Sequence, residues 1–145
     1  MEPVYYRDAS LGCCPVKKYF EQYAPSTKDK PKEKSRKASI LVDIDAKVAF
    51  VVEQSGRAIA PISFKMRDYD YFEIKHRKDK NIVIRVFYFR HVDQIVLLNA
   101  LEKPDDYDTS KERRKIEKEL KITQDYLNKF KTNPKLYEKY DINFN

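Results

Sequence analysis

The stretch NIVIRVFYFRHVDQIVLLNALEKP, residues 81–104, decides the fold, because it predicts two adjacent β-strands. Residues 82–89 are β-branched or aromatic apart from Arg85, and residues 95–101 are aliphatic apart from Asn99. Continuous apolar runs of this kind are typical of strands that are buried on both faces at the centre of a sheet. A buried guanidinium stays charged, so it must be paired, hydrogen-bonded or turned toward an anion. The role of Arg85 is therefore the central functional question.

Two more strands are expected in the chain. Residues 71–77, YFEIKHR, alternate between apolar and charged side chains, which predicts a half-buried strand. The turn KDKN leads from it into the opening stretch, so three antiparallel strands follow one another as a meander. A short strand is expected at residues 4–7, and residues 57–70 are expected to be irregular with short β-prone patches.

Three helices are predicted from the spacing of apolar side chains. Residues 15–24 begin with a proline and repeat apolar residues every three or four positions. A second helix is expected from Ser39, a suitable N-cap, to about residue 54, with Gly56 as its C-terminal cap. A third helix is expected over residues 109–133. The predicted fold class is α+β, with an N-terminal strand and two helices on a mainly antiparallel sheet that ends in the meander, plus a C-terminal helix.

The length of 145 residues predicts one domain, residues 1–145. Residues 26–38 are basic and almost free of apolar side chains, which predicts a flexible insert between two helices. A solvated loop is the favoured interpretation of this insert, and a nucleic-acid-binding arm is the alternative. The tyrosine-rich tail at residues 134–145 either docks on the fold or stays loose.

Composition narrows the class of partner. The net charge of +7 and the pI near 9.2 favour a polyanion such as nucleic acid, or an acidic protein, although a lysine-rich chain is also simply more soluble. With only two glycines, glycine-rich phosphate loops and dinucleotide-binding motifs are not expected. The adjacent Cys13 and Cys14 and the two remote histidines lack the spacing of a zinc site. We therefore expect a reduced cytoplasmic protein without metal or cofactor.

No membrane association is expected either. The N-terminal residues, MEPVYYRD, carry an acid and no apolar core segment, unlike a signal peptide. The apolar runs elsewhere are too short and too interrupted to span a bilayer.

Several segments together resemble a known family. YFEIK, IRVFYF, IVLLNALEK and the last helix resemble the phage-derived, HigB-like branch of the RelE/ParE toxin superfamily. That branch has an aromatic-E-aliphatic-basic strand, then R-aliphatic-aliphatic-Y-aromatic, then an I-V-L-L strand that ends in a lysine. VYYRD and CPVKKYFEQY also resemble its first strand and helix, so the resemblance covers most of the chain outside the insert and the tail.

The resemblance implies a RelE-like fold and the toxin of a type II toxin-antitoxin system. Such toxins are most often endoribonucleases that cleave mRNA, often on the ribosome, without a metal. The implied partners are a small antitoxin, commonly a helix-turn-helix protein, and RNA. By this match Arg85, Lys75 and Lys103 take the family's basic positions, and Glu73 takes a position expected to be structural. The chain departs from the family in having Lys75 in place of the usual arginine.

The chemistry of metal-free RNA cleavage gives these residues roles. Attack by a 2′-hydroxyl needs a base, cations for the charge that develops on phosphorus, and an acid for the leaving oxygen. We expect Arg85 and Lys75 to clamp the phosphate, with Lys103 or Arg77 adding positive charge. The candidates for proton transfer are His76, His91, Tyr126 and a lysine of lowered pKa. The candidate RNA-binding residues are Arg77, Lys78, Arg90, His91 and Tyr88.

Each candidate also has a structural interpretation. Arg85 could pair only with Glu73. His76 alternates onto the side of apolar residues, where a core histidine is more common than a base. His91 would be solvated in a turn, and Tyr126 would pack beside its helix neighbours. The functional alternative to a ribonuclease is a non-enzymatic toxin or binding protein of the same fold, such as a ParE-like gyrase inhibitor.

Overall fold

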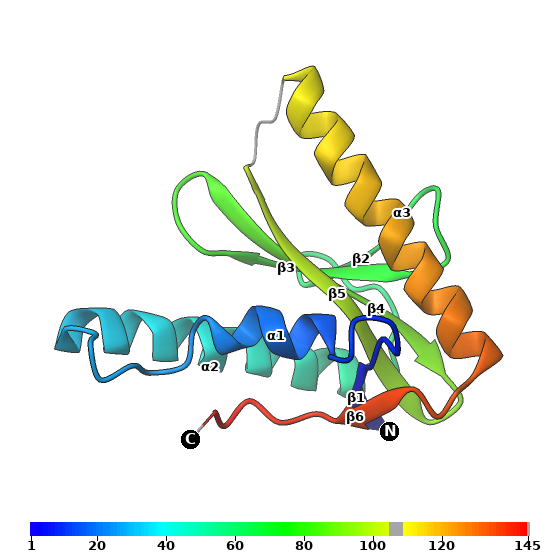
Figure 1. The fold of residues 1–145 in the computed structure, drawn as a ribbon, viewed down its shortest axis with the longest axis horizontal. Coiled ribbons are helices and arrows are strands. Elements are labelled where there is room, and N and C mark those ends of the chain that lie inside the picture. Colours follow the sequence, from blue (N-terminus) through cyan, green and yellow to red (C-terminus); the bar gives the residue numbers. More distant parts are fainter. Residues whose placement is uncertain (105–108, 145) are drawn as a thin grey trace.

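The computed structural model describes residues 1–104 and 109–144 of the chain. Over these residues a six-stranded sheet has helices on both faces, and its strand order is β2-β3-β4-β5-β1-β6 (Figure 1). The elements in chain order are β1 (Glu2–Tyr6), α1 (Pro15–Glu21), α2 (Pro31–Glu53), β2 (Ser63–Lys65), β3 (Phe72–Arg77), β4 (Ile82–His91), β5 (Gln94–Pro104), α3 (Ser110–Thr132) and β6 (Tyr137–Lys139).

The two strands predicted from residues 81–104 form the centre of the sheet. β4 pairs antiparallel with β3 on one side and with β5 on the other, which confirms the predicted meander. β1 lies parallel to β5 and makes the sheet mixed. Since both faces of β4 and β5 are covered, their long apolar runs are buried as expected. The predicted α+β class is confirmed at this level.

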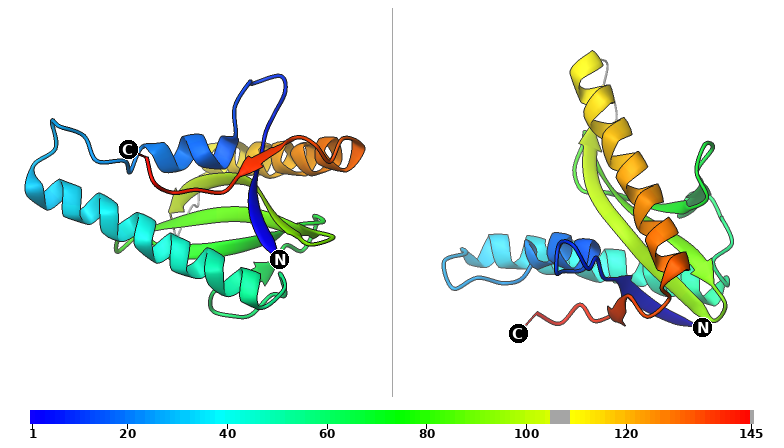
Figure 2. Two further views of the ribbon diagram at one scale, coloured as in Figure 1. Left: turned by 90° about the horizontal axis from the view of Figure 1, so that it is seen from below. Right: turned by 45° about the vertical axis from the view of Figure 1, so that its right-hand side comes forward.

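The sheet separates two apolar cores. α1 and α2 cover one face, where the side chains of Ile84 and Val86 lie, and α3 covers the other face, where Phe87 and Phe89 lie (Figures 1 and 2). Successive side chains of a strand point to opposite faces. Arg85 therefore belongs to the α3 face of β4.

α3 follows the predicted amphipathic pattern. Thr109 caps it, since its hydroxyl accepts a hydrogen bond of 3.2 Å from the backbone N–H of Glu112. The buried side chains form one stripe along an otherwise charged helix: Ile116, Thr123, Leu127 and Phe130. Within the described residues, neither α3 nor another helix combines the length and apolarity needed to cross a membrane.

α2 begins earlier than predicted. It starts at Pro31, so residues 31–38 of the expected flexible insert are helical and Ser39 lies inside the helix rather than at its N-cap. Pro31 has the backbone angle of a first helical turn, and the lysines, glutamate and alanine that follow favour a helix without needing burial. A search for apolar periodicity misses such a segment. α1 is shorter than predicted and ends at Glu21.

The end of α2 matches the prediction. Gly56 has a φ angle of +81° and its N–H donates to the carbonyl of Val51 over 2.9 Å, which terminates the helix. A Cβ at this position would lie 2.9 Å from the side chain of Ile95. The backbone angle therefore favours glycine here, and a side chain would also displace the terminal methyl group of Ile95.

The C-terminal tail docks on the fold. β6 pairs antiparallel with β1. Beyond it, the Tyr140 hydroxyl donates to Asp45 of α2 over 2.7 Å, and the Tyr5 hydroxyl donates to the carbonyl of Asp141 over 2.7 Å. The docked alternative is thus the observed one for residues 134–144, while residue 145 lies outside the described residues.

We predict that Leu127→Ala lowers the free energy of unfolding by about 2–5 kcal/mol, because Leu127 is fully buried between α3 and the sheet. Urea titration followed by circular dichroism measures this loss. The exposed Lys131 of the same helix supplies the control, since Lys131→Ala should change stability by less than about 0.5 kcal/mol. A loss below about 1 kcal/mol for Leu127→Ala would contradict the packing of α3.

Candidate functional site

The structure brings the three basic residues of the predicted site together. Lys75 of β3 and Arg85 of β4 are cross-strand partners. Arg77 and Lys103 both face Val83, from β3 and β5 respectively, so they occupy the next row of the same face. We call the Arg85 cluster the group formed by Glu73, Lys75, Arg77, Arg85 and Lys103.

Glu73 is the acid at the centre of this cluster. Its two carboxylate oxygens accept bonds of 3.2 and 3.1 Å from Nη1 of Arg85, and Lys75 Nζ lies 3.6 Å from Oε1. The side chains of Arg85 and Glu73 are only 11% and 9% exposed. The pairing expected for a structural arginine is therefore present.

Glu73 does not engage all the donors of Arg85. Nε of Arg85 is buried with no hydrogen-bond partner among the described residues. An arginine presents five N–H donors, of which Glu73 engages one Nη group. The cluster therefore combines a preformed ion pair with basic side chains from three strands, an arrangement that suits an anionic ligand.

Lys103 is the most perturbed member of the cluster. It is buried, with 6% of its surface exposed. Burial first, and then the charges of Arg85 and Lys75, lower the pKa of its ammonium group to about 8, while the charge of Glu73 opposes this shift. At neutral pH a fraction of this side chain is therefore a neutral amine that accepts a proton. This matches the predicted lysine of lowered pKa.

An aromatic residue that the sequence did not indicate completes the edge of the cluster. Nζ of Lys75 lies 4.4 Å from the ring centroid of Phe64, the cross-strand neighbour of Glu73 on β2. The aromatic face holds the ammonium group by a cation–π contact. Because β2 has only three residues, alternation cannot identify it in the sequence.

A cavity of about 240 Å³ lies beside the cluster, between the end of β5 and the first half of α3. Leu101, the β5 partner of Arg85, and Ile116 give it apolar walls, while Glu112 and Glu119 make it acidic. The acidic side chains make this cavity unsuited to a phosphate.

His76 does not join the cluster, because it points to the opposite face of β3. Its Nδ1 lies 2.8 Å from Nζ of Lys47 on α2. Burial, and then the charge of Lys47, lower the pKa of His76. The predicted catalytic role is thus corrected in favour of a core histidine that accepts a hydrogen bond.

Lys78 and Tyr88 also lie on the α1 and α2 side of the sheet. Lys78 donates to Glu102 over 2.8 Å, and the Tyr88 hydroxyl donates to the carbonyl of Gly56 over 3.1 Å. Tyr88 is fully buried. Its predicted stacking on RNA is therefore wrong, and its role is to pack the core.

Arg90 and His91 lie at the other end of β4. His91 lies six positions after Arg85 in β4, which corresponds to about 20 Å along a strand. The ring of His91 packs edge-on against that of Phe130, with 5.1 Å between the ring centroids. Arg90 donates to the carbonyl of Val92 over 3.2 Å. Neither residue reaches an anion held at the cluster, so neither predicted role there is supported.

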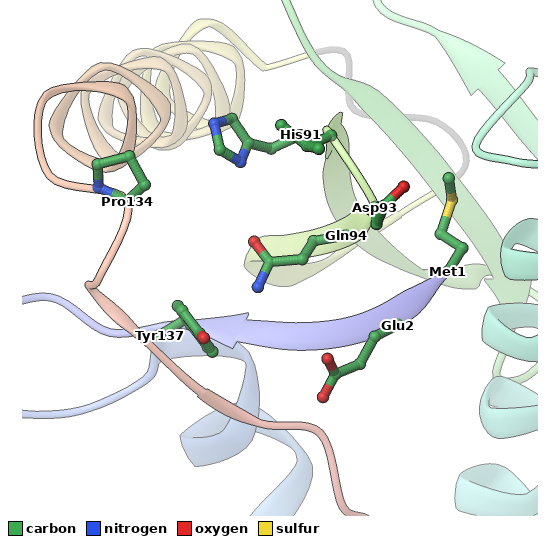
Figure 3. A pocket seen from close by; sticks show the side chains of 8 residues that line it. Met1, Glu2, His91, Asp93, Gln94, Pro134 and Tyr137 are labelled. Atoms are coloured by element: carbon green, nitrogen blue, oxygen red, sulfur yellow. The ribbon is translucent and has the colours of Figure 1, made fainter.

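His91 borders a cavity of about 520 Å³ at that distant end (Figure 3). Asp93 of the β4–β5 turn and Gln94 of β5 line it together with Glu2 of β1 and Tyr137 of β6. Its acidic side chains do not suit a phosphate. This cavity is therefore separate from the Arg85 cluster in position and in charge.

Tyr126 packs against β1. Its ring lies 5.1 Å from that of Tyr6, and burial raises the pKa of its hydroxyl to about 12, with Asp8 adding to the shift. In the strand order β1 is two positions from β4, about 10 Å across the sheet. The interpretation of Tyr126 as a packing residue fits this position better than proton transfer at the cluster.

Cysteines and acids do not assemble a metal centre in the part of the chain that the structure describes. Cys13 and Cys14 are both free thiols there. The Cys14 thiol donates to Glu138 over 3.2 Å, and burial raises its pKa to about 12. This cysteine therefore contributes to docking of the tail.

No family model, curated protein or solved structure was found to match the chain. The resemblance to the RelE/ParE superfamily therefore stays a prediction from the sequence motifs.

We predict that Lys103→Met is more stable than the parent near pH 7, and that the difference shrinks by about 2 kcal/mol as pH rises from about 8 to 10.5. In this range the unfolded parent binds the proton of Lys103 and the folded parent does not, so the parent gains stability as pH rises. Urea titrations of both proteins across pH measure the difference. A difference that stays constant would show that the pKa of Lys103 is not lowered.

Proposed function

We propose that this chain is the toxin of a type II toxin-antitoxin pair, with a RelE-like fold, and that it cleaves mRNA in the cytoplasm without a metal. The observation that carries the proposal is the Arg85 cluster. Lys75, Arg85 and Lys103 come from three different strands, yet they lie in adjacent rows of one face. The buried Lys103, with a pKa of about 8, adds a base to the cations that a phosphate requires.

The proposed reaction uses the 2′-hydroxyl of the RNA as the nucleophile. The neutral amine of Lys103 takes the proton of this hydroxyl, and the 2′-oxygen forms a bond to phosphorus. Arg85, Lys75 and Arg77 stabilise the negative charge that develops on the phosphate oxygens. The bond from phosphorus to the 5′-oxygen then breaks, and this oxygen takes a proton from solvent. The products are a 2′,3′-cyclic phosphate and a 5′-hydroxyl.

Glu73 has a positioning role in this proposal. Its two bonds fix the guanidinium of Arg85 and leave the other donors of the planar fork for the phosphate. Its charge also raises the pKa of Lys103, opposing burial. The carboxylate thus limits how far burial lowers the pKa of the base.

The proposed protein partner is a small antitoxin, with a helix-turn-helix as the commonest type in such pairs. An antitoxin that covers the α3 face beside β3 would block access to Lys75, which is 36% exposed. Acidic side chains on the antitoxin would complement the basic side chains of the cluster.

A second candidate function is a non-enzymatic toxin of the same fold, such as a gyrase inhibitor. The enclosure of Arg85 with Glu73 favours it, because this pair by itself explains a charged residue in a central strand. The two candidates differ in whether loss of the cluster abolishes RNA cleavage.

We predict that Arg85→Ala lowers the rate of RNA cleavage by about 100-fold or more, because it removes the bidentate cation from the phosphate. A labelled mRNA, with and without ribosomes, measures the rate. The double variant Arg85→Met with Glu73→Gln guards against misfolding, since it removes both charges of the buried pair together. Arg90→Gln on the same strand is the matched control and should cleave like the parent.

Cleavage by the double variant at the parental rate would contradict the proposed site. If the parent cleaves no RNA at high concentration but inhibits DNA gyrase, the second candidate is correct.

We also predict that the cleavage rate of the parent rises with pH and levels off near pH 8, since only the neutral amine of Lys103 acts as a base. Single-turnover rates between pH 5.5 and 9 measure this profile, and Lys103→Met should abolish the rise and lower the rate. An unchanged profile in Lys103→Met would assign the base to another group.

A further inference from the structure

The N-terminal part of α2 projects beyond the sheet. The first buried side chain of α2 is that of Ile40, so the nine residues 31–39 precede the core and extend about 14 Å as a helix. Figures 1 and 2 show this end of α2 reaching past the strands. Of these nine residues, Lys37 alone is partly covered. Packing of the core therefore does not explain their composition.

Basic side chains dominate this projection. We call residues 28–37, KDKPKEKSRK, the basic arm. It holds six lysines or arginines and two acids, an excess of four positive charges within a net charge of +7 for the whole chain. Most of the protein's excess charge is therefore concentrated on a segment that contributes little to the core.

The arrangement of these charges opposes the helix rather than supporting it. Lys32 and Arg36 are four residues apart, so like charges repel along one side of the helix, as do Lys30 and Lys34 at its start. Glu33 and Lys37 are the favourable pair at this spacing, and Lys37 also bonds Asp29 over 2.8 Å. Stability of the helix would be better served by acids at these positions.

The arm is also continuous with the end of the sheet that carries the Arg85 cluster. Arg36 and Lys37 line a cavity of about 230 Å³ together with Lys78, which lies at the end of β3. Lys78 directly follows Arg77, the cluster residue at the same end of β3. The arm and the cluster therefore lie near the same end of β3, on opposite faces of the sheet.

We propose that the basic arm is a second RNA-binding surface, which holds the phosphate backbone of RNA away from the cleaved bond. This inference rests on the proposed ribonuclease function. A basic segment close to the end of the sheet that carries a phosphate-binding cluster fits a polynucleotide, whose charges continue in both directions from the reacting phosphate. The alternative partner is an acidic protein, and binding to poly-glutamate distinguishes it from RNA.

The experiment compares RNA binding by the full-length parent, an arm variant and a control variant. The arm variant replaces Lys30, Lys32, Lys34 and Arg36 with glutamine, which preserves helix propensity. The control variant removes four exposed lysines elsewhere, Lys118, Lys121, Lys131 and Lys135, in the same way. Fluorescence anisotropy with a single-stranded RNA of about 30 nucleotides gives the affinity at several salt concentrations.

We expect the arm variant to bind this RNA at least 10-fold more weakly than the control at low salt. The slope of log affinity against log salt should fall by up to about 3, since each lost single-strand phosphate contact contributes about 0.7. A dinucleotide substrate that reaches only the cluster should be cleaved equally by all three proteins. Unchanged circular dichroism shows that α2 remains folded, and the smaller variant Lys32→Gln with Arg36→Gln serves if it does not.

Equal RNA affinity and salt slope in the arm and control variants would overturn the inference while leaving cleavage intact. The inference would also be overturned, in favour of an acidic protein partner, if the arm variant lost more affinity for poly-glutamate than for RNA. Absence of both cleavage and RNA binding in the parent would overturn the proposed function and this inference together.

Discussion

The ion pair between Arg85 and Glu73 is the interaction on which the rest of the site depends. A charged residue at the centre of a buried strand requires a partner, and β3 supplies one diagonally, two residues from the cross-strand position of Arg85. With Glu73 in place, two further cations, Lys75 and Lys103, can lie near it. The burial of Lys103 and the charges of Arg85 and Lys75 then lower the pKa of Lys103. One buried contact thus sets the geometry and the protonation of its neighbours.

Most of the fold follows from local sequence patterns. β4 and β5 are predictable because strands buried on both faces carry uninterrupted apolar runs, and α3 because its apolar stripe repeats at helical spacing. β2 and β6 are three residues each, too short to show alternation. The start of α2 is missed for another reason: it is polar all round, so helix propensity is its sole indication.

The residues of the candidate site can be predicted from the sequence only where the pairing of neighbouring strands fixes their position. Lys75, Arg85 and Lys103 meet because the register of the meander aligns them, and the sequence motifs place them correctly. The predicted role of His76 is wrong because successive residues of a strand face opposite sides, so His76 cannot share a site with Lys75. The predicted role of His91 at the cluster is not supported because His91 lies far from Arg85 along β4. The pKa of Lys103 cannot be predicted from the sequence, because it depends on how deeply the folded structure buries this side chain.

The docking of β6 on β1 has a consequence for the order of events during synthesis. β1 precedes both β5 and β6 in the chain, so it is synthesised before either of the strands that pair with its two edges. Until β6 docks, the outer edge of β1 is unpaired and can bind another strand. The docking of β6 therefore protects this edge of the sheet against pairing with other chains.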